Sequence, residues 1–368
     1  MIIKLEQIQD ACAKMSNALD ANVLSVLSET LELKTEGTTL LINVTNREYF
    51  ATVRVNINEP VEFHATVNAN LFLKLISQIT TETVELSVDG TTLYVKGNGK
   101  YKLPLIFDGD HLMELPPINI VNTTAEFDVK SAVLKSILDY NSKELVKGAI
   151  SSPIQRLYYI DDKGAITFTS GACVNEFTLA HPVKMLLNDR IVRLFKLFKE
   201  TDVHFVMGHD PISETIVQTK VAFSDKNVSI TAILSCDDSM ITGVPVEAIR
   251  GRASNQYPYT INVDKDAVLE TIGRMMLFSD KGAAKLYATV QFNEDNLVLY
   301  DVHKDNNETV YYSNSVAALK EPYTAVFDLI DLKLTLENCS EKYVTISFGD
   351  HQAAVFSRAS IKNIIPEC

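Results

Sequence analysis

The sequence predicts an α+β protein built from six copies of one unit, in which a strand, a helix and further strands follow one another. Three observations lead to this prediction. A short apolar segment precedes each run of helical apolar periodicity, alternating β-branched segments follow the run, and successive copies begin roughly 60 to 75 residues apart. The strand and helix of the six copies are expected at residues 1–15, 65–77, 127–138, 184–198, 261–273 and 326–338.

Three of the predicted helices begin beside a residue that favours an N-cap. Asp128, Asn188 and Asp264 each have a short side chain whose oxygen can accept a free first-turn N–H. The segments after the helices alternate apolar and polar residues and are separated by short turns, which is typical of hairpins. We expect such strands at residues 84–88, 92–95, 203–206, 215–223, 228–234, 343–348 and 353–356.

Two copies make about 120 residues, which is an ordinary domain size. We therefore expect three similar domains, at residues 1–121, 122–252 and 253–368. The boundaries fall near two segments with turn-forming residues, 108–124 and 237–259, which we interpret as linkers. Each domain is expected to have antiparallel sheets with two helices on one face. The alternative is a multidomain α+β protein in which the repetition is accidental.

The composition limits the class of protein. With 46% hydrophobic residues the chain has enough apolar surface for a core, so it is not a disordered protein. The net charge of −13 argues against a protein that wraps nucleic acid over its whole surface, but it leaves open one basic face. No signal peptide or membrane span is visible, and the five cysteines form no C-x-x-C pair, so we expect free thiols in a reducing cytoplasm.

Cations recur on one side of the predicted helices. On a helical wheel, five of the six helices place Lys or Arg opposite the apolar face. A single exposed lysine is usually just solvated, and Asp10, Asp139 and Glu270 share these faces. The recurrence nevertheless predicts a surface for weak, sequence-independent phosphate contact. The predicted contact residues are Lys14, Lys74, Lys135, Arg190, Arg193, Lys196, Lys199 and Arg274.

The sequence contains no recognisable catalytic constellation. Its seven histidines form no H-E-x-x-H motif and no metal-type spacing with cysteine, and no G-x-S-x-G occurs. The acidic segments 108–111 and 301–305 fall in predicted turns, where Asp is favoured for backbone geometry. Residues 97–100 (GNGK) lack the rest of a P-loop and join two predicted strands. We therefore expect a binding or scaffolding protein with no catalytic residues, no metal and no cofactor.

Several ordered segments resemble the bacterial DNA sliding clamp, the beta subunit of DNA polymerase III. Residues 22–33 (NVLSVLSETLEL) are similar to a first-domain segment of that family, and residues 101–116 (YKLPLIFDGDHLMELP) to the strand and turn that close the first domain. Residues 157–174 (LYYIDDKGAITFTSGACV) resemble a second-domain stretch, and Val244-Pro245 falls where the third domain begins. With the repeat, the resemblance covers essentially the whole chain.

The resemblance implies a DNA polymerase processivity factor that is not an enzyme. In that family two chains join head to tail into a ring, helices line the hole, sheets form the outside, and double-stranded DNA passes through. The implied partners are duplex DNA, a DNA polymerase, a clamp loader and a second copy of the chain. The implied dimer contact joins residues 100–107 to the region of residues 265–278.

The resemblance also implies a pocket for partner peptides between the second and third domains. Two departures affect it: Ala172-Cys173 stand where the family has His-Arg, and residues 357–368 read as a longer C-terminal end. A clamp encoded by a bacteriophage with its own polymerase would account for both. The implied pocket residues are Ile154, Thr169, Gly171, Ala172, Cys173, Val174, Pro245, Ile249, Val355 and Ser357.

Two other functions stay open at this point. The first is an assembly scaffold of repeated α+β domains with no role on DNA. The second is an enzyme whose reactive groups converge in space from distant positions. Retention on DNA and an effect on primer extension separate the clamp from both.

Overall fold

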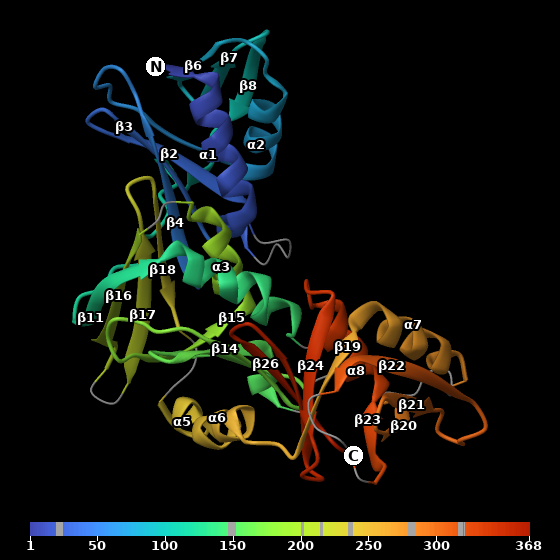
Figure 1. The fold of residues 1–368 in the computed structure, drawn as a ribbon. Coiled ribbons are helices and arrows are strands. Elements are labelled where there is room, and N and C mark those ends of the chain that lie inside the picture. Colours follow the sequence, from blue (N-terminus) through green and yellow to red (C-terminus); the bar gives the residue numbers. More distant parts are fainter. Residues whose placement is uncertain are drawn as a thin grey trace. The chain divides into compact units, whose positions relative to one another are not determined.

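The computed structural model describes residues 1–19, 25–145, 152–199, 202–213, 216–234, 238–278, 285–315, 319 and 321–368 (Figure 1). These residues contain the six predicted copies. In every copy one strand runs directly into a helix, and an antiparallel meander of three strands follows. In the fourth copy the regular helix is short, and a 3-10 turn, η4 (Leu194–Leu197), continues it.

The copies have the following elements. Copy 1 has β1 (Ile2–Lys4), α1 (Leu5–Ala18), β2 (Thr30–Glu36), β3 (Thr39–Thr45) and β4 (Tyr49–Asn56), and copy 2 has β5 (His64–Asn68), α2 (Ala69–Gln78), β6 (Thr83–Asp89), β7 (Thr92–Lys96) and β8 (Lys100–Pro104). Copy 3 has β11 (Thr123–Lys130), α3 (Ser131–Asp139), β12 (Leu157–Asp161), β13 (Gly164–Phe168) and β14 (Ala172–Glu176), and copy 4 has β15 (Lys184–Asn188), α4 (Asp189–Arg193), β16 (Asp202–Pro211), β17 (Val217–Ser224) and β18 (Val228–Ile233). Copy 5 has β19 (Tyr259–Asp264), α7 (Lys265–Met275), β20 (Tyr287–Phe292), β21 (Asn296–Tyr300) and β22 (Asn307–Ser315), and copy 6 has β23 (Tyr323–Asp328), α8 (Leu329–Glu337), β24 (Tyr343–Phe348), β25 (Ala353–Arg358) and β26 (Ile361–Pro366).

Neighbouring copies exchange their first strands. β1 pairs with β6 of the second copy, and β5 pairs with β2 of the first. The same exchange joins β11 to β16 and β15 to β12, and it joins β19 to β24 and β23 to β20. Neither copy of a pair can therefore complete its sheet without the other, which makes the pair of copies the natural building block.

Three further strand pairings extend these sheets. β4 pairs with β18, which gives an eight-stranded sheet, and β14 pairs with β26 within a twelve-stranded sheet, which the pairing of β19 with the end of β22 makes continuous. The chain consequently divides into two compact units, Met1–Lys135 with Arg190–Asp237, and Ser136–Asp189 with Asp238–Cys368. The second predicted domain contributes to both units because each of its two sheets pairs with a neighbour. Its boundaries at residues 122 and 252 stay a prediction.

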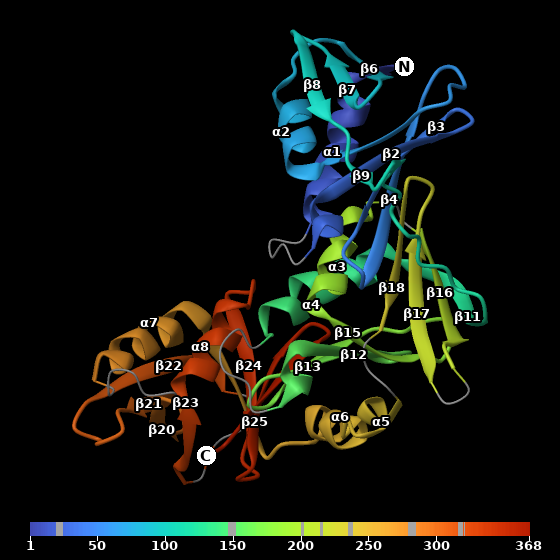
Figure 2. The same cartoon turned by 180° about the vertical axis from the view of Figure 1, so that it is seen from behind.

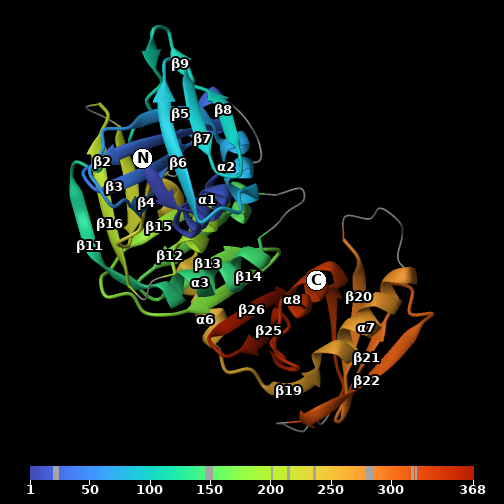
Figure 3. The same ribbon diagram turned by 90° about the horizontal axis from the view of Figure 1, so that it is seen from above.

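The helices cover the sheets through their apolar faces. In the first unit α1 and α2 lie side by side (Figures 1 and 2), and α1 buries Ile8 and Met15 completely. The Gln9 amide donates hydrogen bonds of 3.0 Å to the carbonyl oxygens of Ile76 and Ile79, which satisfies the C-terminal end of α2. In the second unit α7 and α8 cover the sheets of copies 5 and 6 (Figure 3).

Two local predictions were wrong. Asp128 lies inside β11 beside His204, and α3 begins only at Ser131, so Asp128 is no N-cap. The predicted linker at residues 237–259 contains two helices, α5 (Asp238–Thr242) and α6 (Val246–Ser254). The C-terminal end at residues 357–368 contains β26, which lies between β14 and β25 in the sheet.

Removal of the α7 N-cap tests the local analysis. Asp264 accepts hydrogen bonds from the N–H groups of Asp266 (3.0 Å) and Ala267 (3.3 Å). Asp264→Ala should lower the free energy of unfolding by about 1 kcal/mol. Asp128→Ala, at a site wrongly predicted as a cap, should stay within about 0.5 kcal/mol. Urea unfolding followed by circular dichroism checks both, and equal losses would contradict the assignment.

Candidate functional site

The fourth copy gathers four of the predicted phosphate-contact residues on α4, on η4 and just after η4. Arg193, Lys196 and Lys199 are exposed, whereas Ile191, Leu194 and Phe195 on the other side are buried. The segment is thus amphipathic as predicted, although half of it is a 3-10 turn. Arg190 is half-buried, and its Nη1 donates to Glu48 Oε1 at 3.1 Å.

Carboxylates of the first unit neutralise part of this charge. Asp10 on α1 lies 2.8 Å from the Lys14 ammonium and 3.5 Å from that of Lys199. The hydrogen bond from Lys14, with burial opposing and Lys199 assisting, holds the pKa of Asp10 below its ordinary value. Lys14 has only 14% of its side chain exposed, so it is less available to a ligand than its helical position predicts.

Three predicted contact residues are exposed and have no ion pair in the described part of the chain. Lys74, Lys135 and Lys196 are exposed, and none of them forms an ion pair within the described ranges. An unpaired ammonium can approach a phosphate without first breaking an intramolecular bond, so these three are the strongest candidates for phosphate contact.

Arg274 forms its hydrogen bonds and ion pairs within the second unit. Its Nε and Nη2 donate to the two carboxylate oxygens of Glu308 on β22 at 2.8 and 2.5 Å, and Glu308 also accepts the Thr271 hydroxyl at 3.0 Å. The paired guanidinium lowers the pKa of Glu308. A planar two-bond pair of this kind fixes orientation, so Arg274 braces the strand β22.

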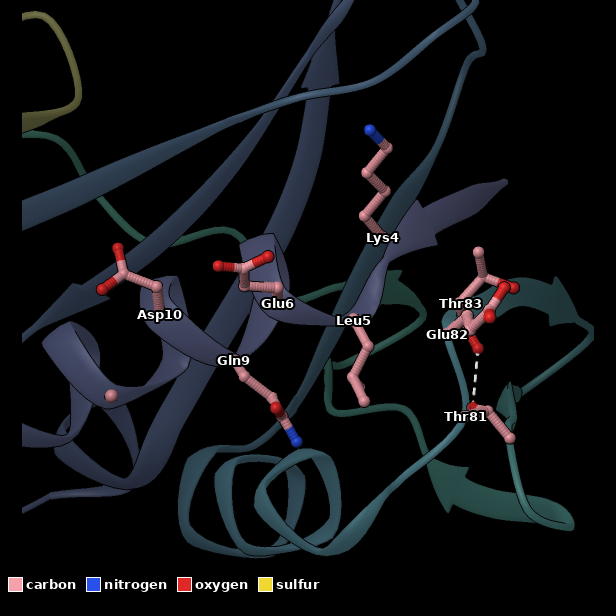
Figure 4. A pocket seen from close by; sticks show the side chains of 9 residues that line it. Lys4, Leu5, Glu6, Gln9, Asp10, Thr81, Glu82 and Thr83 are labelled. Carbon is pink, nitrogen blue, oxygen red and sulfur yellow. Dashed lines mark hydrogen bonds between the residues drawn. The ribbon is translucent and has the colours of Figure 1, made fainter.

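A pocket beside the beginning of α1 has a different character (Figure 4). Glu6 and Asp10 line it from α1, Glu82 lines it from the loop before β6, and Lys4 is its only cation. An excess of carboxylate repels phosphate, so this pocket is no candidate for DNA contact. Within the described residues no group of three or more His, Cys, Asp or Glu is placed to hold a metal ion. No helix there is long and apolar enough to cross a membrane.

The residues implied for partner peptides come from several elements of the second unit. Ile154 lies on the 3-10 turn η3 (Pro153–Arg156), Pro245 and Ile249 lie at the beginning of α6, and Val355 and Ser357 lie on β25. α6 contacts β14 and β26, which brings these elements together. Arg250 on α6 holds Asp161 at the end of β12 with bonds of 2.7 and 2.6 Å. Burial acts to raise the pKa of Asp161, but the bonds from Arg250 outweigh it and hold the pKa below its ordinary value.

Strand alternation separates the predicted pocket residues into two sets. Ala172 and Val174 lie on one face of β14, and Cys173 lies on the other, fully buried, with its sulfur 4.0 Å from the Asn141 amide nitrogen. The side chain of Cys173 is therefore on the opposite face of the strand from those of Ala172 and Val174, and it cannot line the same pocket.

Sequence reasoning missed the strand that completes this region. Ile364 on β26 lies between Ala172 and Val355 in the sheet, and Pro366 lies near Gly171. The signal was weak, because residues 361–366 do not alternate apolar and polar side chains, and only the β-branched Ile361, Ile364 and Ile365 after the turn at 359–360 favour a strand.

Comparison with solved structures gives one fold over the whole chain. The chain is similar to DNA polymerase III subunit beta from Pseudomonas aeruginosa, with 14% identity, a TM-score of 0.81, and coverage of 100% of this chain and 99% of that one. The corresponding values are 14%, 0.79, 100% and 99% for the beta subunit from Streptococcus pyogenes, and 14%, 0.76, 100% and 98% for the DNA polymerase sliding clamp from Bacillus subtilis. A search of curated protein sequences found no match.

The six strand–helix–meander copies of the chain thus have the fold of these solved DNA sliding clamps. Residues 1–111 match the family described as "DNA polymerase III beta subunit, N-terminal domain". Residues 1–111 are therefore similar to that domain, and at 14% identity the solved clamps show that the chain shares their fold over its full length.

The close packing of β14 on β26 gives a test of the partner region. A Cβ atom at Gly171 would lie 1.9 Å from the Ile364 carbonyl oxygen, so Gly171→Ala should lower the free energy of unfolding by about 1–3 kcal/mol. Gly251 on α6 has no such neighbour within 4 Å, and Gly251→Ala should raise stability by about 0.5–1 kcal/mol. Urea unfolding of both variants measures the difference. An unchanged Gly171→Ala variant would show that the two strands are not packed in this way.

Proposed function

We propose that this protein is a DNA polymerase processivity factor, which closes as a dimeric ring around duplex DNA, slides along it and tethers the polymerase. The observation that carries the proposal is the sixfold repeat with exchanged strands, which has the fold of known sliding clamps over the whole chain. The chain itself performs no reaction. A clamp loader opens the ring, and the protein acts in the cytoplasm of a bacterial cell or of a phage-infected host.

The charge distribution supports a topological mode of retention. Each phosphate contact adds affinity that salt weakens, so a clamp that must slide benefits from few contacts. Lys74, Lys135 and Lys196 remain unpaired in the described part of the chain, whereas Asp10 and Glu308 engage several of the other cations. We assign direct phosphate contact to these three lysines, with Arg193 beside them.

Two junctions inside the chain indicate how a second chain joins. The last strand of copy 1 (β4) pairs with the last strand of copy 4 (β18), and that of copy 3 (β14) pairs with that of copy 6 (β26). Each odd-numbered copy thus pairs with the copy three places further on. The same rule pairs copy 5 with copy 2 of a second chain, through β22 and β8. β8 borders its sheet, β22 pairs with β19 only from Tyr312 onward and leaves residues 307–311 without a partner on that side in the described chain, and an unpaired edge favours such an addition.

The register of the contact between β22 and β8 follows from the positions that are paired at the two internal junctions. At the internal junctions the central inward-facing pairs are Ala51–Ile230 and Cys173–Asn363. The corresponding positions of copies 5 and 2 are Glu308 and Tyr101, and their neighbours bring Thr309 opposite Lys100. Since Arg274 holds Glu308 at this edge, we assign Arg274 to support of the dimer contact instead of to DNA.

The ring is tested by retention on DNA. The protein, loaded on nicked circular DNA by the loader of its source cell, should stay bound and should be lost when the DNA is linearised. Replacing Lys74, Lys135 and Lys196 together by Gln should leave the dimer intact and lower loading several-fold at 0.15 M salt. Lys130→Gln, at a lysine paired with Asp202, is the matched control. Equal retention on circular and linear DNA would contradict the topological mechanism, and an unaffected primer extension would favour a scaffold without a DNA role.

The dimer register has its own test. The Asp301 N–H bonds to the Asn306 carbonyl, and alternation along β22 then directs the N–H of Thr309 away from β21. Thr309→Pro should remove an intermolecular hydrogen bond, strain the strand and raise the dimer dissociation constant about tenfold. Thr309→Ala should have little effect. Sedimentation velocity measures both. A monomeric parent chain at micromolar concentration would overturn the ring itself, whereas an unaffected Thr309→Pro dimer would overturn only the register.

A further inference from the structure

A buried ion pair spans the junction between the second and third predicted domains. Glu144 follows the 3-10 turn η2 (Asn141–Lys143) of copy 3, and Arg358 ends β25 of copy 6. The side chain of Glu144 is 0% exposed and that of Arg358 is 1% exposed, and Arg358 Nη2 lies 3.6 Å from Glu144 Oε1. Both side chains lie on the inward face of the twelve-stranded sheet, at the place where β14 pairs with β26.

This pair leaves several polar atoms without a direct partner. Arg358 Nη1 donates to the Thr335 carbonyl at 3.2 Å and contacts the sulfur of Cys339. Within the described residues no hydrogen bond of 3.5 Å or less reaches Arg358 Nε or Nη2, either carboxylate oxygen of Glu144, Asn338 Nδ2 or Asn363 Oδ1, although the guanidinium and the two amides lie close enough to act on the pKa of Glu144. Donors and acceptors are both present in this set. Buried polar atoms are normally satisfied, and where protein groups do not reach them ordered water does.

The other internal junction shows that the fold does not require this cluster. Between β4 and β18 the inward-facing pairs are Ala51–Ile230 and Tyr49–Ala232, which are apolar. The backbone pairing of β14 with β26 is of the same antiparallel kind, yet Asn363 lies opposite Cys173 there. The charged cluster is therefore an addition specific to the second junction.

We propose that Glu144, Arg358, Asn338 and Asn363 bind internal water molecules and form with them a latch that locks copy 3 to copy 6. The latch goes beyond the proposed clamp function and does not depend on it. Its bridging waters connect Glu144 with the free donors of Arg358 and Asn338 and give Asn363 Oδ1 a donor. The latch has groups from both sides of the junction, so opening the β14–β26 pairing exposes or separates the two charges.

The protonation of Glu144 depends on the charged and titratable groups around it, and it can be followed as a change of stability with pH. Burial raises the pKa of Glu144, although Arg358 and the amides of Asn338 and Asn363 oppose this. The thiols of Cys173 and Cys339, whose pKa values burial raises, stay neutral beside it, and Tyr140 faces the guanidinium. A raised pKa means that the folded state holds a proton more tightly than the unfolded state, so this contribution to stability declines as the pH rises above about 4.3.

Amide hydrogen exchange and variants of the pair test the latch. In Arg358→Met, amides of residues 172–175 and 361–364 should exchange at least tenfold faster, because Glu144 is left buried without its partner. Amides of residues 49–53 and 228–232 at the apolar junction should be unchanged, and Lys130→Met, which removes an exposed pair, should change neither region. The double variant Glu144→Met with Arg358→Met should recover at least half of the lost protection. Unchanged exchange at residues 172–175 and 361–364 in Arg358→Met would overturn the latch.

Further variants and a crystal structure also test the latch. If Arg358→Met does not fold, the double variant should still fold, and its failure to fold would overturn the proposal. Glu144→Gln should remove the decline in protection that the parent chain shows above pH 4.3, and an identical pH profile of the two proteins would show that Glu144 is not the titrating group. A crystal structure at high resolution should show ordered water between Glu144 and Arg358, and direct contact of all six atoms with protein groups would overturn the water-bridged form.

Discussion

The structure depends on the requirement that the last strand of every meander must find a partner for its free edge. A three-strand meander satisfies its own inner hydrogen bonds, and the exchanged first strand covers one side. The other side presents unpaired N–H and C=O groups, which in water invite another strand. Inside this chain, copy 1 meets copy 4 and copy 3 meets copy 6 at such edges. The helices have no part in these pairings, so they are left on the faces of the sheets, where their charged sides are available for a ligand.

The electrostatics follow from the same arrangement. The chain has a net charge of −13, and its helices nevertheless carry cations opposite their apolar faces. Asp10 pairs with Lys14 within α1, the packing of α1 against η4 brings Lys199 to Asp10 as well, and the packing of α7 against β22 brings Glu308 to Arg274. The pairs of Lys199 and Arg274 stabilise contacts between elements, and among the predicted phosphate-contact residues Lys74, Lys135 and Lys196 have no ion pair in the described ranges. Weak attraction suits the proposed topological retention, because tight phosphate binding would oppose sliding.

The sequence predicted the features that depend on local pattern. The strands near residues 84–88, 343–348 and 353–356 are found where alternation placed them, and Asp264 caps its helix, because these signals involve residues close together in the chain. What the sequence did not reveal depends on contacts between distant residues. β26 is a strand in the middle of a sheet only because β14 lies beside it, and the pairing of Lys199 depends on the position of Asp10. The separation of Cys173 from Ala172 and Val174, by contrast, follows from alternation and was open to prediction.

Backbone pairing alone does not say which edge joins which, because every last strand offers the same pattern of N–H and C=O groups. Side chains at the inward-facing positions can supply the choice. If β26 paired with β4, Asn363 would face Ala51, and Arg358 would be buried without Glu144, with an unpaired charge that costs several kcal/mol. If β18 paired with β14, apolar Ile230 would take the place of Asn363, and Glu144 would be buried without Arg358. The apolar junction and the charged junction therefore exclude each other's strands, and this mutual exclusion selects one order of copies along the chain.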